Sequence, residues 1–344
     1  MPASYSSSRR SRTCRQISNP TARRVGMRKH TAGHVLVVGA LLFGSSALCA
    51  EDAAATGAFD AHEVSFLSHG VTLSGAVIVP RSPVVAAAVF VQGAGSDLRP
   101  APQGEALARF GIAVLVYDKR GIGRSGGVYV GDKPGDVNGS RENLRLLADD
   151  AAAAMDTLRE ERTLRLVPKG FIGQSQAGWI IPQAVLKARG ARFMVLWSGA
   201  VETTHEDVLF EQLAAAPDFW DQHTHAEVSK MMNDPANSIE FAWADYDPRA
   251  ALDQLKIPGL WLFGGRDRNA DVDLSIERLK GLIARGHSNY EYHLYPSYDH
   301  YLGGLNADVV GATVEWTRKA LAETRKPTSD SVRARGRRSG TVWP

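Results

Sequence analysis

The sequence predicts an α/β fold: a mostly parallel, doubly wound sheet with helices on both faces and a small helical cap. Three continuous apolar runs, at 84–91, 112–117 and 193–197, have the composition of short strands that are buried on both sides. Between such runs lie segments in which apolar residues recur at helical spacing, as in 142–161. Strands that alternate with helices along a chain favour a parallel sheet.

The remaining elements continue this alternation along the chain. We expect two strands within 62–80 that meet around Gly70, a helix at 103–110, a strand from Leu166 to Ile172 and a helix after it, a strand at 259–263, a helix at 273–285, a strand at 290–295 and a last helix at 307–322. A chain of 344 residues has room for one large α/β domain, which we place at 51–324.

One segment, 201–256, interrupts the alternation between two strands. It is acidic, contains six scattered aromatic residues and is too long for a plain connection in a compact domain. We expect this segment to form the helical cap, a mobile lid whose aromatic side chains line the pocket beneath it. The alternative is that these aromatic side chains only attach the segment to the main domain.

The first fifty residues have the features of an export signal. Residues 1–26 are rich in Ser, Arg and Thr, and Met27 begins a basic stretch that precedes the apolar run 35–43 and the small residues 44–50. This order is typical of a secretory signal peptide, and nine apolar residues are too few to span a membrane. We expect an extension and signal peptide at 1–50, translation from Met27, and a periplasmic or secreted protein. The alternative is an uncleaved membrane anchor.

Charge and cysteine content narrow the class of function. Residues 1–50 and the tail 325–344 carry net charges of +8 and +5, which leaves −10 for the part between them. The basic pI of 8.8 therefore belongs to the two ends, which argues against a nucleic-acid partner for the folded part. The tail has no apolar period, and we expect it to be disordered. Cys14 and Cys49 both precede the expected mature start, so the mature chain contains no thiol.

The stretch around Ser175 has the pattern of a nucleophile elbow. An apolar run ends at Gly173-Gln-Ser175-Gln-Ala177, and a helical pattern follows at once. A serine at the apex of a sharp strand-to-helix turn needs small neighbours two residues away on each side, and glycine and alanine meet that requirement. The alternative interpretation is an ordinary strand-to-helix turn.

A serine nucleophile needs a base and a group that orients the base. Asp267 directly follows the predicted strand 259–263, and His300 lies in the loop after the strand 290–295, so both fall at the carboxyl edge of the sheet. Asp271 and Asp273 compete for the acid, although Asp273 better suits the start of a helix. His293 lies within a strand and is expected to be structural.

Two backbone N–H groups could stabilise an oxyanion beside Ser175. One belongs to Gln176, which follows the serine, and the other to Ala94 in the loop after the strand 84–91. Glycines at 93 and 95 let that backbone approach a ligand closely.

Two patterns suggest a metal or a nucleotide, and neither is complete. His223 and His225 have the spacing of metal ligands, but no third ligand lies at useful spacing. Gly121-x-Gly123-x-x-Gly126 follows a strand, but further glycines and a proline come next where a dinucleotide site requires a helix. We therefore expect no metal and no cofactor.

Five segments carry a resemblance to a known family. In chain order they are FVQGAGSDLR, VLVYDKRGIGRSGG, FIGQSQAGWI, LWLFGGRD and YDHYLGG. With the serine, acid and histidine in this order, the chain resembles the α/β-hydrolase superfamily over about residues 62–322. The detail is similar to its bacterial esterase and serine-aminopeptidase branch, which is related to the dienelactone hydrolases and prolyl oligopeptidases.

The resemblance implies the α/β-hydrolase fold with a cap before the acid-bearing strand. It also implies that Asp118 and Arg120 support their loop and take no part in catalysis. Two positions depart from the family pattern: Gln92 stands where histidine is frequent, and Ala177 where the second elbow glycine is usual.

We expect a serine hydrolase of carboxylic esters (EC 3.1.1) that acts on a small-molecule ester or a short peptide, with no stable membrane insertion after signal cleavage. A serine peptidase of the aminopeptidase type is the alternative within the same chemistry. It would need cap carboxylates to hold a substrate amine, and Glu202, Glu206 and Asp207 are available. A non-catalytic binding protein on the same fold is the alternative from another class. The oligomeric state is left open.

Overall fold

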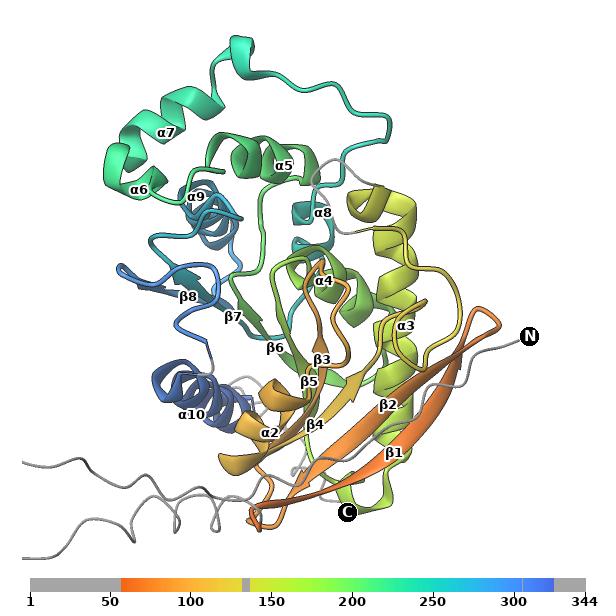
Figure 1. Ribbon diagram of the computed structural model, residues 1–344. Helices are drawn as coiled ribbons and strands as arrows, with labels where there is room; N and C mark the ends of the chain where they lie inside the picture. The colour runs from red at the N-terminus through yellow and green to blue at the C-terminus, as the bar shows by residue number, and fades with distance from the viewer. Residues whose placement is uncertain (1–56, 132–136, 305, 325–344) are drawn as a thin grey trace, which may run out of the picture. The chain divides into compact units, whose positions relative to one another are not determined.

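The computed structural model describes residues 57–131, 137–304 and 306–324, and an eight-stranded sheet runs through them (Figure 1). The strand order is β1-β2-β4-β3-β5-β6-β7-β8. β2 pairs antiparallel with both β1 and β4, and every other neighbouring pair is parallel. The strands are β1 (Phe59–Ser68), β2 (Val71–Pro80), β3 (Ala86–Val91), β4 (Ile112–Tyr117), β5 (Lys169–Gln174), β6 (Ala191–Trp197), β7 (Gly259–Gly264) and β8 (Tyr290–Tyr295).

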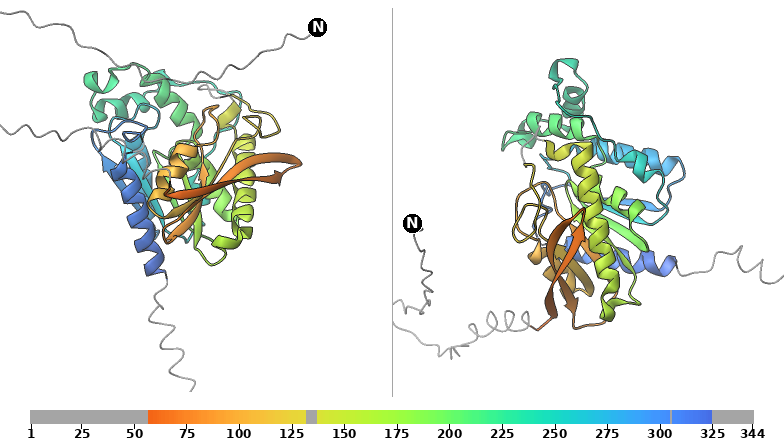
Figure 2. Two further views of the ribbon diagram at one scale, coloured as in Figure 1. Left: turned by 60° about the horizontal axis from the view of Figure 1, so that its bottom comes forward. Right: turned by 90° about the vertical axis from the view of Figure 1, so that its right-hand side faces the viewer.

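Helices cover both faces of this sheet, as predicted. On one face, α3 (Arg141–Glu160), α4 (Ala177–Lys187), α8 (Arg249–Leu252) and α9 (Val272–Ala284) pack on a large apolar core. On the other face, α2 (Ala101–Arg109) and α10 (Ala307–Glu323) pack on a second core. Figure 2 shows α10 and α3 on opposite sides of the strands. The mostly parallel sheet with two helical layers confirms the predicted α/β fold.

The central strands form where the apolar runs predict them. Every residue of β3 and β4 is buried, as is expected of strands covered on both faces. The β1–β2 hairpin turns through His69 and Gly70, whose φ angles of +48° and +73° suit a two-residue turn in which both residues have positive φ. Ser140 caps α3 by accepting the N–H of Asn143 at 3.3 Å.

Four α-helices follow β6 before β7 begins: α5 (Thr204–Leu213), α6 (Phe219–Gln222), α7 (His225–Met232) and α8. Capping boxes start both α5 and α7, at Thr203 with Glu206 and at Thr224 with Glu227. Phe210, Ala214, Phe219 and Val228 form a small apolar cluster between these helices. In Figure 1 the helices α5, α6 and α7 lie beyond one end of the strands. We keep the name cap for the segment 201–256, which contains these helices.

The structure moves several predicted boundaries by up to three residues and leaves the chain ends untested. The elbow strand begins at Lys169 and not at Leu166, whose side chain is 95% exposed. The predicted signal region 1–50, both cysteines and the tail 325–344 lie outside the described residues. In the described part of the chain, no helix combines the length and the apolar character needed to cross a membrane.

Candidate active site

Ser175 lies at the apex of the sharp turn between β5 and α4. Its φ of +58° places it in the left-handed region, which costs an L-residue about 1 kcal/mol. The Ser175 N–H donates to the carbonyl of Trp197 at 2.9 Å, and the Gly178 N–H donates to the carbonyl of Ser175 at 2.8 Å. The turn therefore holds a half-buried serine side chain at the carboxyl end of β5.

Close backbone approaches explain the small residues around the serine. A Cβ on Gly173 would lie 2.6 Å from the Cβ of Ala177. A Cβ on Gly178 would lie 2.3 Å from the carbonyl oxygen of Ala200. Because Gly173 carries no Cβ, the chain has room for an alanine at 177, where the family pattern has glycine.

Asp267 and His300 form a buried pair. Nδ1 of His300 lies 2.8 Å and 3.0 Å from the two carboxylate oxygens of Asp267. The carboxylate also accepts the N–H groups of Asn269 and Ala270, at 2.7 Å and 3.0 Å. Burial opposes the charged form of His300, but the charge of Asp267 and its hydrogen bonds outweigh burial, so the imidazole pKa lies above its usual value.

The competing carboxylates have other partners. Asp271 is the N-cap of α9 and accepts the N–H of Leu274 at 3.1 Å. Asp273 lies in the first turn of α9, at the helix start as predicted, and pairs with His225 at 2.6 Å. Burial raises the pKa of Asp271 to about 6.

A cavity of about 450 Å³ brings the predicted residues together. Ser175 and His300 both line it, and Nδ1 of His300 is bonded to Asp267, so Nε2 is the ring nitrogen that is free to take up a proton. The hydroxyl of Ser175 makes no hydrogen bond within the described part of the chain. Further lining residues come from the loop after β3, from α5 and from the loops after β7 and β8: Gly93, Ala94, Gly95, Asp97, Glu211, Asn269 and Tyr301.

The loop that carries Ala94 is held by its carbonyl oxygens. The buried ammonium of Lys119 donates to the carbonyl oxygens of Gly93 and Ala94, at 2.7 Å and 3.0 Å. The hydroxyl of Tyr129 donates to the Ala94 carbonyl at 2.6 Å, and the amide of Asn138 donates to it at 3.2 Å. These donors hold the carbonyl groups of Gly93 and Ala94 and so fix the orientation of the Ala94 N–H between them.

Gln92 also has a structural role in this loop. Its amide donates to the carbonyl of Tyr117 at 2.9 Å and so links the ends of β3 and β4. The loop is therefore anchored even though Gln92 stands where histidine is frequent in the family.

The fold is shared with known hydrolases. Residues 83–249, just under half of the chain, match the family model described as "Serine aminopeptidase, S33". The esterase Pf2001 of Pyrococcus furiosus superposes with a TM-score of 0.54 at 17% identity, covering 76% of this chain and 90% of that one. The chain therefore has the α/β-hydrolase fold.

Two further structures of this α/β-hydrolase fold are similar to the chain. A lipase in its open form gives a TM-score of 0.54 at 16% identity, covering 76% of this chain and 99% of that one. An acylaminoacyl peptidase of Pyrococcus horikoshii gives 0.51 at 14% identity, covering 80% of this chain and 43% of that one. No curated protein matches the chain in sequence.

The cap is attached to the loop of the candidate acid. The indole N–H of Trp220 donates to the carbonyl of Asp267 at 2.5 Å. The guanidinium of Arg268 donates to the carbonyls of Ala214, Ala215 and Ala216, just after the end of α5. Cations near a helix C-terminus are stabilising. Arg268 therefore caps α5 and also joins the end of this helix to the loop that carries Asp267.

The cap aromatics do not line the cavity, contrary to the sequence-based expectation. Phe210, Phe219 and Trp220 pack on one another, and Trp243 packs on His205 and Phe241. Glu211 is the cap residue that lines the cavity. These contacts lie within the segment, and only the hydrogen bond of Trp220 to Asp267 fits the alternative that the aromatics attach it to the main domain. The cap contains a small apolar cluster of its own, which the sequence analysis did not anticipate.

The cap carboxylates are distributed unevenly with respect to the cavity. Glu202 is buried and bonds to Ser275, and Glu206 pairs with Arg278, so neither faces the cavity. Asp207 is not among the lining residues, and burial raises its pKa. Burial also raises the pKa of Glu211, although Asn269 and His300 oppose the shift. Among the cap carboxylates, Glu211 is the one that lines the cavity, and the sequence analysis did not name it.

The incomplete metal and nucleotide patterns have structural explanations. His225 pairs with Asp273 and stacks on Trp220, and His223 packs on Phe219. Among the described residues, no three His, Cys, Asp or Glu side chains are grouped so as to hold a metal ion. Gly121 lies in a tight loop, where its N–H donates to the carbonyl of Gly126 at 2.8 Å, and no helix opens there.

Proposed function

We propose that this α/β hydrolase cleaves carboxylic esters with Ser175 as nucleophile, His300 as base and Asp267 as the group that orients the base. The observation that carries the proposal is the buried Asp267–His300 pair, which opens into the same cavity as the strained Ser175. Esterase, lipase and peptidase folds among the similar structures support hydrolysis as the class of reaction.

In the first half of the proposed reaction, the Ser175 Oγ attacks the ester carbonyl carbon while its proton passes to Nε2 of His300. Asp267 stabilises the resulting imidazolium through Nδ1. The carbonyl oxygen becomes an oxyanion, which the N–H groups of Ala94 and Gln176 stabilise. The imidazolium then protonates the departing alkoxide oxygen, the C–O bond breaks, and the acyl group remains on Ser175.

In the second half, water replaces the alcohol in the cavity. His300 takes a proton from the water, whose oxygen attacks the acyl carbon. The second tetrahedral intermediate expels Oγ of Ser175, which regains its proton from His300. The carboxylic acid leaves, and the enzyme returns to its starting state with no cofactor consumed.

A fluorophosphonate probe and a panel of p-nitrophenyl esters of different chain lengths test the proposal. Ser175→Ala should lower kcat by about 10⁶-fold and abolish labelling. Ser297→Ala is the matched control, because Ser297 is exposed three residues before His300 and does not line the cavity. Full labelling of Ser175→Ala would disprove the assignment. Failure of the unaltered protein to react with the probe would favour the non-catalytic binding protein.

A serine peptidase that removes N-terminal residues is the second candidate, and Glu211 favours it. The Glu211 carboxylate lies in the same cavity as Ser175 and could pair with a substrate ammonium group. Aminoacyl anilides run beside the esters separate the two candidates. A peptidase should lose anilide hydrolysis when Glu211 is replaced by Gln, while ester hydrolysis persists.

We further propose that the protein is exported through a signal peptide that begins at Met27, with cleavage near Ala50. The proposal rests on the basic start, the apolar run 35–43 and the small residues after it. N-terminal sequencing of the protein from its native host tests it. A mature chain that retains residues 35–43 would contradict it.

A further inference from the structure

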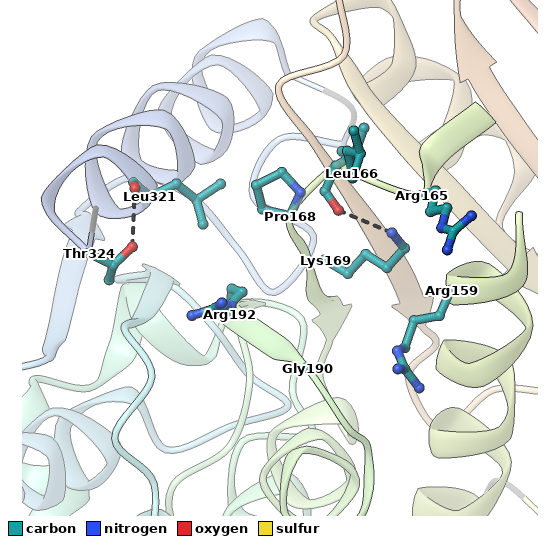
Figure 3. Close-up of a pocket in the computed structure, with 10 residues that line it drawn as sticks. Arg159, Arg165, Leu166, Pro168, Lys169, Gly190, Arg192, Leu321 and Thr324 are labelled. Atoms are coloured by element: carbon teal, nitrogen blue, oxygen red, sulfur yellow. Dashed lines mark hydrogen bonds between the residues drawn. The ribbon is translucent and has the colours of Figure 1, made fainter. Parts of the chain in front are cut away.

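A second cavity, of about 610 Å³, lies at the opposite edge of the sheet from Ser175. It is found where β5 and β6 begin and where α3 and α10 end (Figure 3). β5 runs from Lys169 in this cavity to Gln174 beside Ser175, and six extended residues separate the two edges by about 20 Å. The cavity is therefore distinct from the candidate active site.

Four cationic side chains line this second cavity, and no Asp or Glu is among its lining residues. In Figure 3, Arg159 and Arg165 lie on one side, Arg192 lies on the other and Lys169 lies between them. Such a concentration of positive charge is unexpected in a part of the chain, 51–324, that has a net charge of −10. Like charges gathered in one cavity repel one another unless an anion offsets them.

Few of these cations have partners of opposite charge. Arg159 pairs with Asp156 at 3.1 Å, and both side chains are exposed, so the pair is weak. Within the described residues, neither Arg165 nor Arg192 makes an ion pair or a side-chain hydrogen bond. Many other arginines of this chain do, as Arg81, Arg120 and Arg278 illustrate.

Lys169 is the buried member of the group. Its side chain is almost fully buried, and its ammonium donates to the carbonyls of Leu164 at 2.6 Å and Val167 at 3.1 Å. An ammonium has three N–H donors, so one remains for a ligand. Burial and the charge of Arg159 lower the pKa of Lys169, and a bound anion would reverse that shift.

We propose that this cavity binds a ligand that carries two neighbouring phosphate groups. Guanidinium groups pair with phosphate oxygens through two parallel hydrogen bonds, and the two partnerless arginines supply one such fork each. The volume exceeds what a single phosphate fills and lies within the usual range for small-molecule sites. Leu166, 95% exposed at the cavity, offers an apolar contact to whatever group the phosphates are attached to. This proposal is independent of the proposed function.

Calorimetric titration of the full chain with inorganic pyrophosphate and with orthophosphate, at physiological ionic strength, tests the proposal. The altered protein is Arg165→Gln combined with Arg192→Gln, and both side chains are exposed, so its melting temperature should stay unchanged. Arg145→Gln is the matched control, since Arg145 is an exposed arginine of α3 outside the cavity.

We expect pyrophosphate to bind one to one, at least about tenfold more tightly than orthophosphate, and at least about tenfold more weakly to the double variant. The control should bind like the unaltered protein. A second arm uses phosphatidylcholine vesicles with and without cardiolipin, a lipid with two phosphates. Cardiolipin-dependent sedimentation that the double variant loses, without pyrophosphate binding, assigns the phosphates to a lipid headgroup. The proposal is overturned by an absence of binding in both arms, by equal affinity for the two phosphates, or by equal loss in the control.

Discussion

The indole N–H of Trp220 reaches the backbone carbonyl of Asp267 over 2.5 Å and so joins the cap to the residue that orients His300. Stacking of Trp220 on His225, and the pair of His225 with Asp273, extend this connection to the first turn of α9. The cap and the acid loop are thus positioned together. Movement of α6 would therefore displace the backbone of Asp267, the candidate acid.

Replacing Trp220 by Phe keeps an aromatic ring in the cap and removes the hydrogen bond to Asp267. We expect kcat/KM to fall about fivefold, the worth of one neutral hydrogen bond, and by the same factor for short and long esters, because Trp220 does not line the cavity. Trp243→Phe, whose ring packs on His205 and Phe241, is the control and should retain activity. Unequal losses across the ester series would show that Trp220 contacts the acyl chain.

Replacing Asp267 by Asn should lower kcat by about 10⁴, because the amide would favour the wrong tautomer of His300. Asp271→Asn is the matched control. Asparagine remains a good N-cap for α9, so steady-state ester hydrolysis by that variant should stay close to the unaltered rate. If the two variants exchanged these effects, Asp271 would be the acid.

Glu211 should influence the pH at which hydrolysis begins. As a base, His300 must be neutral, so the rate rises as pH passes upward through its pKa, which lies above the usual value. Burial lowers this pKa, Asp267 raises it, and the negative charge of Glu211 adds a further, smaller rise. Glu211→Gln should therefore move the acidic limb of kcat/KM to lower pH.

The control for the pH profile is Asp97→Asn, another carboxylate that lines the cavity and lies beside Gly95. It should shift the limb less than Glu211→Gln does. An acidic limb that moves to higher pH in Glu211→Gln would contradict the electrostatic coupling of Glu211 to His300.

Lys119 should act on the oxyanion through the loop it holds. Lys119→Met removes both hydrogen bonds to the carbonyls of Gly93 and Ala94. We expect kcat to fall by about 10- to 100-fold while KM changes little. Displacing the N–H of Ala94 weakens its hydrogen bond to the oxyanion more than it weakens binding of the uncharged ester. Tyr129→Phe removes one hydrogen bond to the same Ala94 carbonyl and should have a smaller effect. A rise in KM with kcat unchanged would place Lys119 in ester binding instead.

The central strands could be predicted from sequence because continuous apolar runs are typical of strands that are buried on both faces. The runs that became β3 and β4 are apolar throughout, so their burial requires no knowledge of neighbours. Ser175, Asp267 and His300 could be selected because each closely follows a predicted strand, and parallel strands end at one edge. The structure indeed places Asp267 and His300 in contact.

The missed features depend on contacts between distant segments. Glu211 is one of many acidic residues in the cap, and only the packing of α5 brings it into the cavity. The Trp220–Asp267 hydrogen bond joins residues 47 positions apart and uses a backbone acceptor, which leaves no trace in composition. Leu166 extends the apolar run before β5 in the sequence, yet the preceding turn leaves it outside the sheet.

The backbone of Ser175 implies that this protein sacrifices folding stability at its candidate nucleophile. Ser175→Gly and Ser175→Ala both remove the hydroxyl, but only glycine adopts a φ of +58° without penalty. Glycine normally destabilises a folded chain relative to alanine, and here the order should reverse by about 1 kcal/mol, or about 2–4 °C in melting temperature. If the inactive Ser175→Gly protein melts at a higher temperature than Ser175→Ala, the strained backbone of this one residue lowers folding stability in exchange for activity.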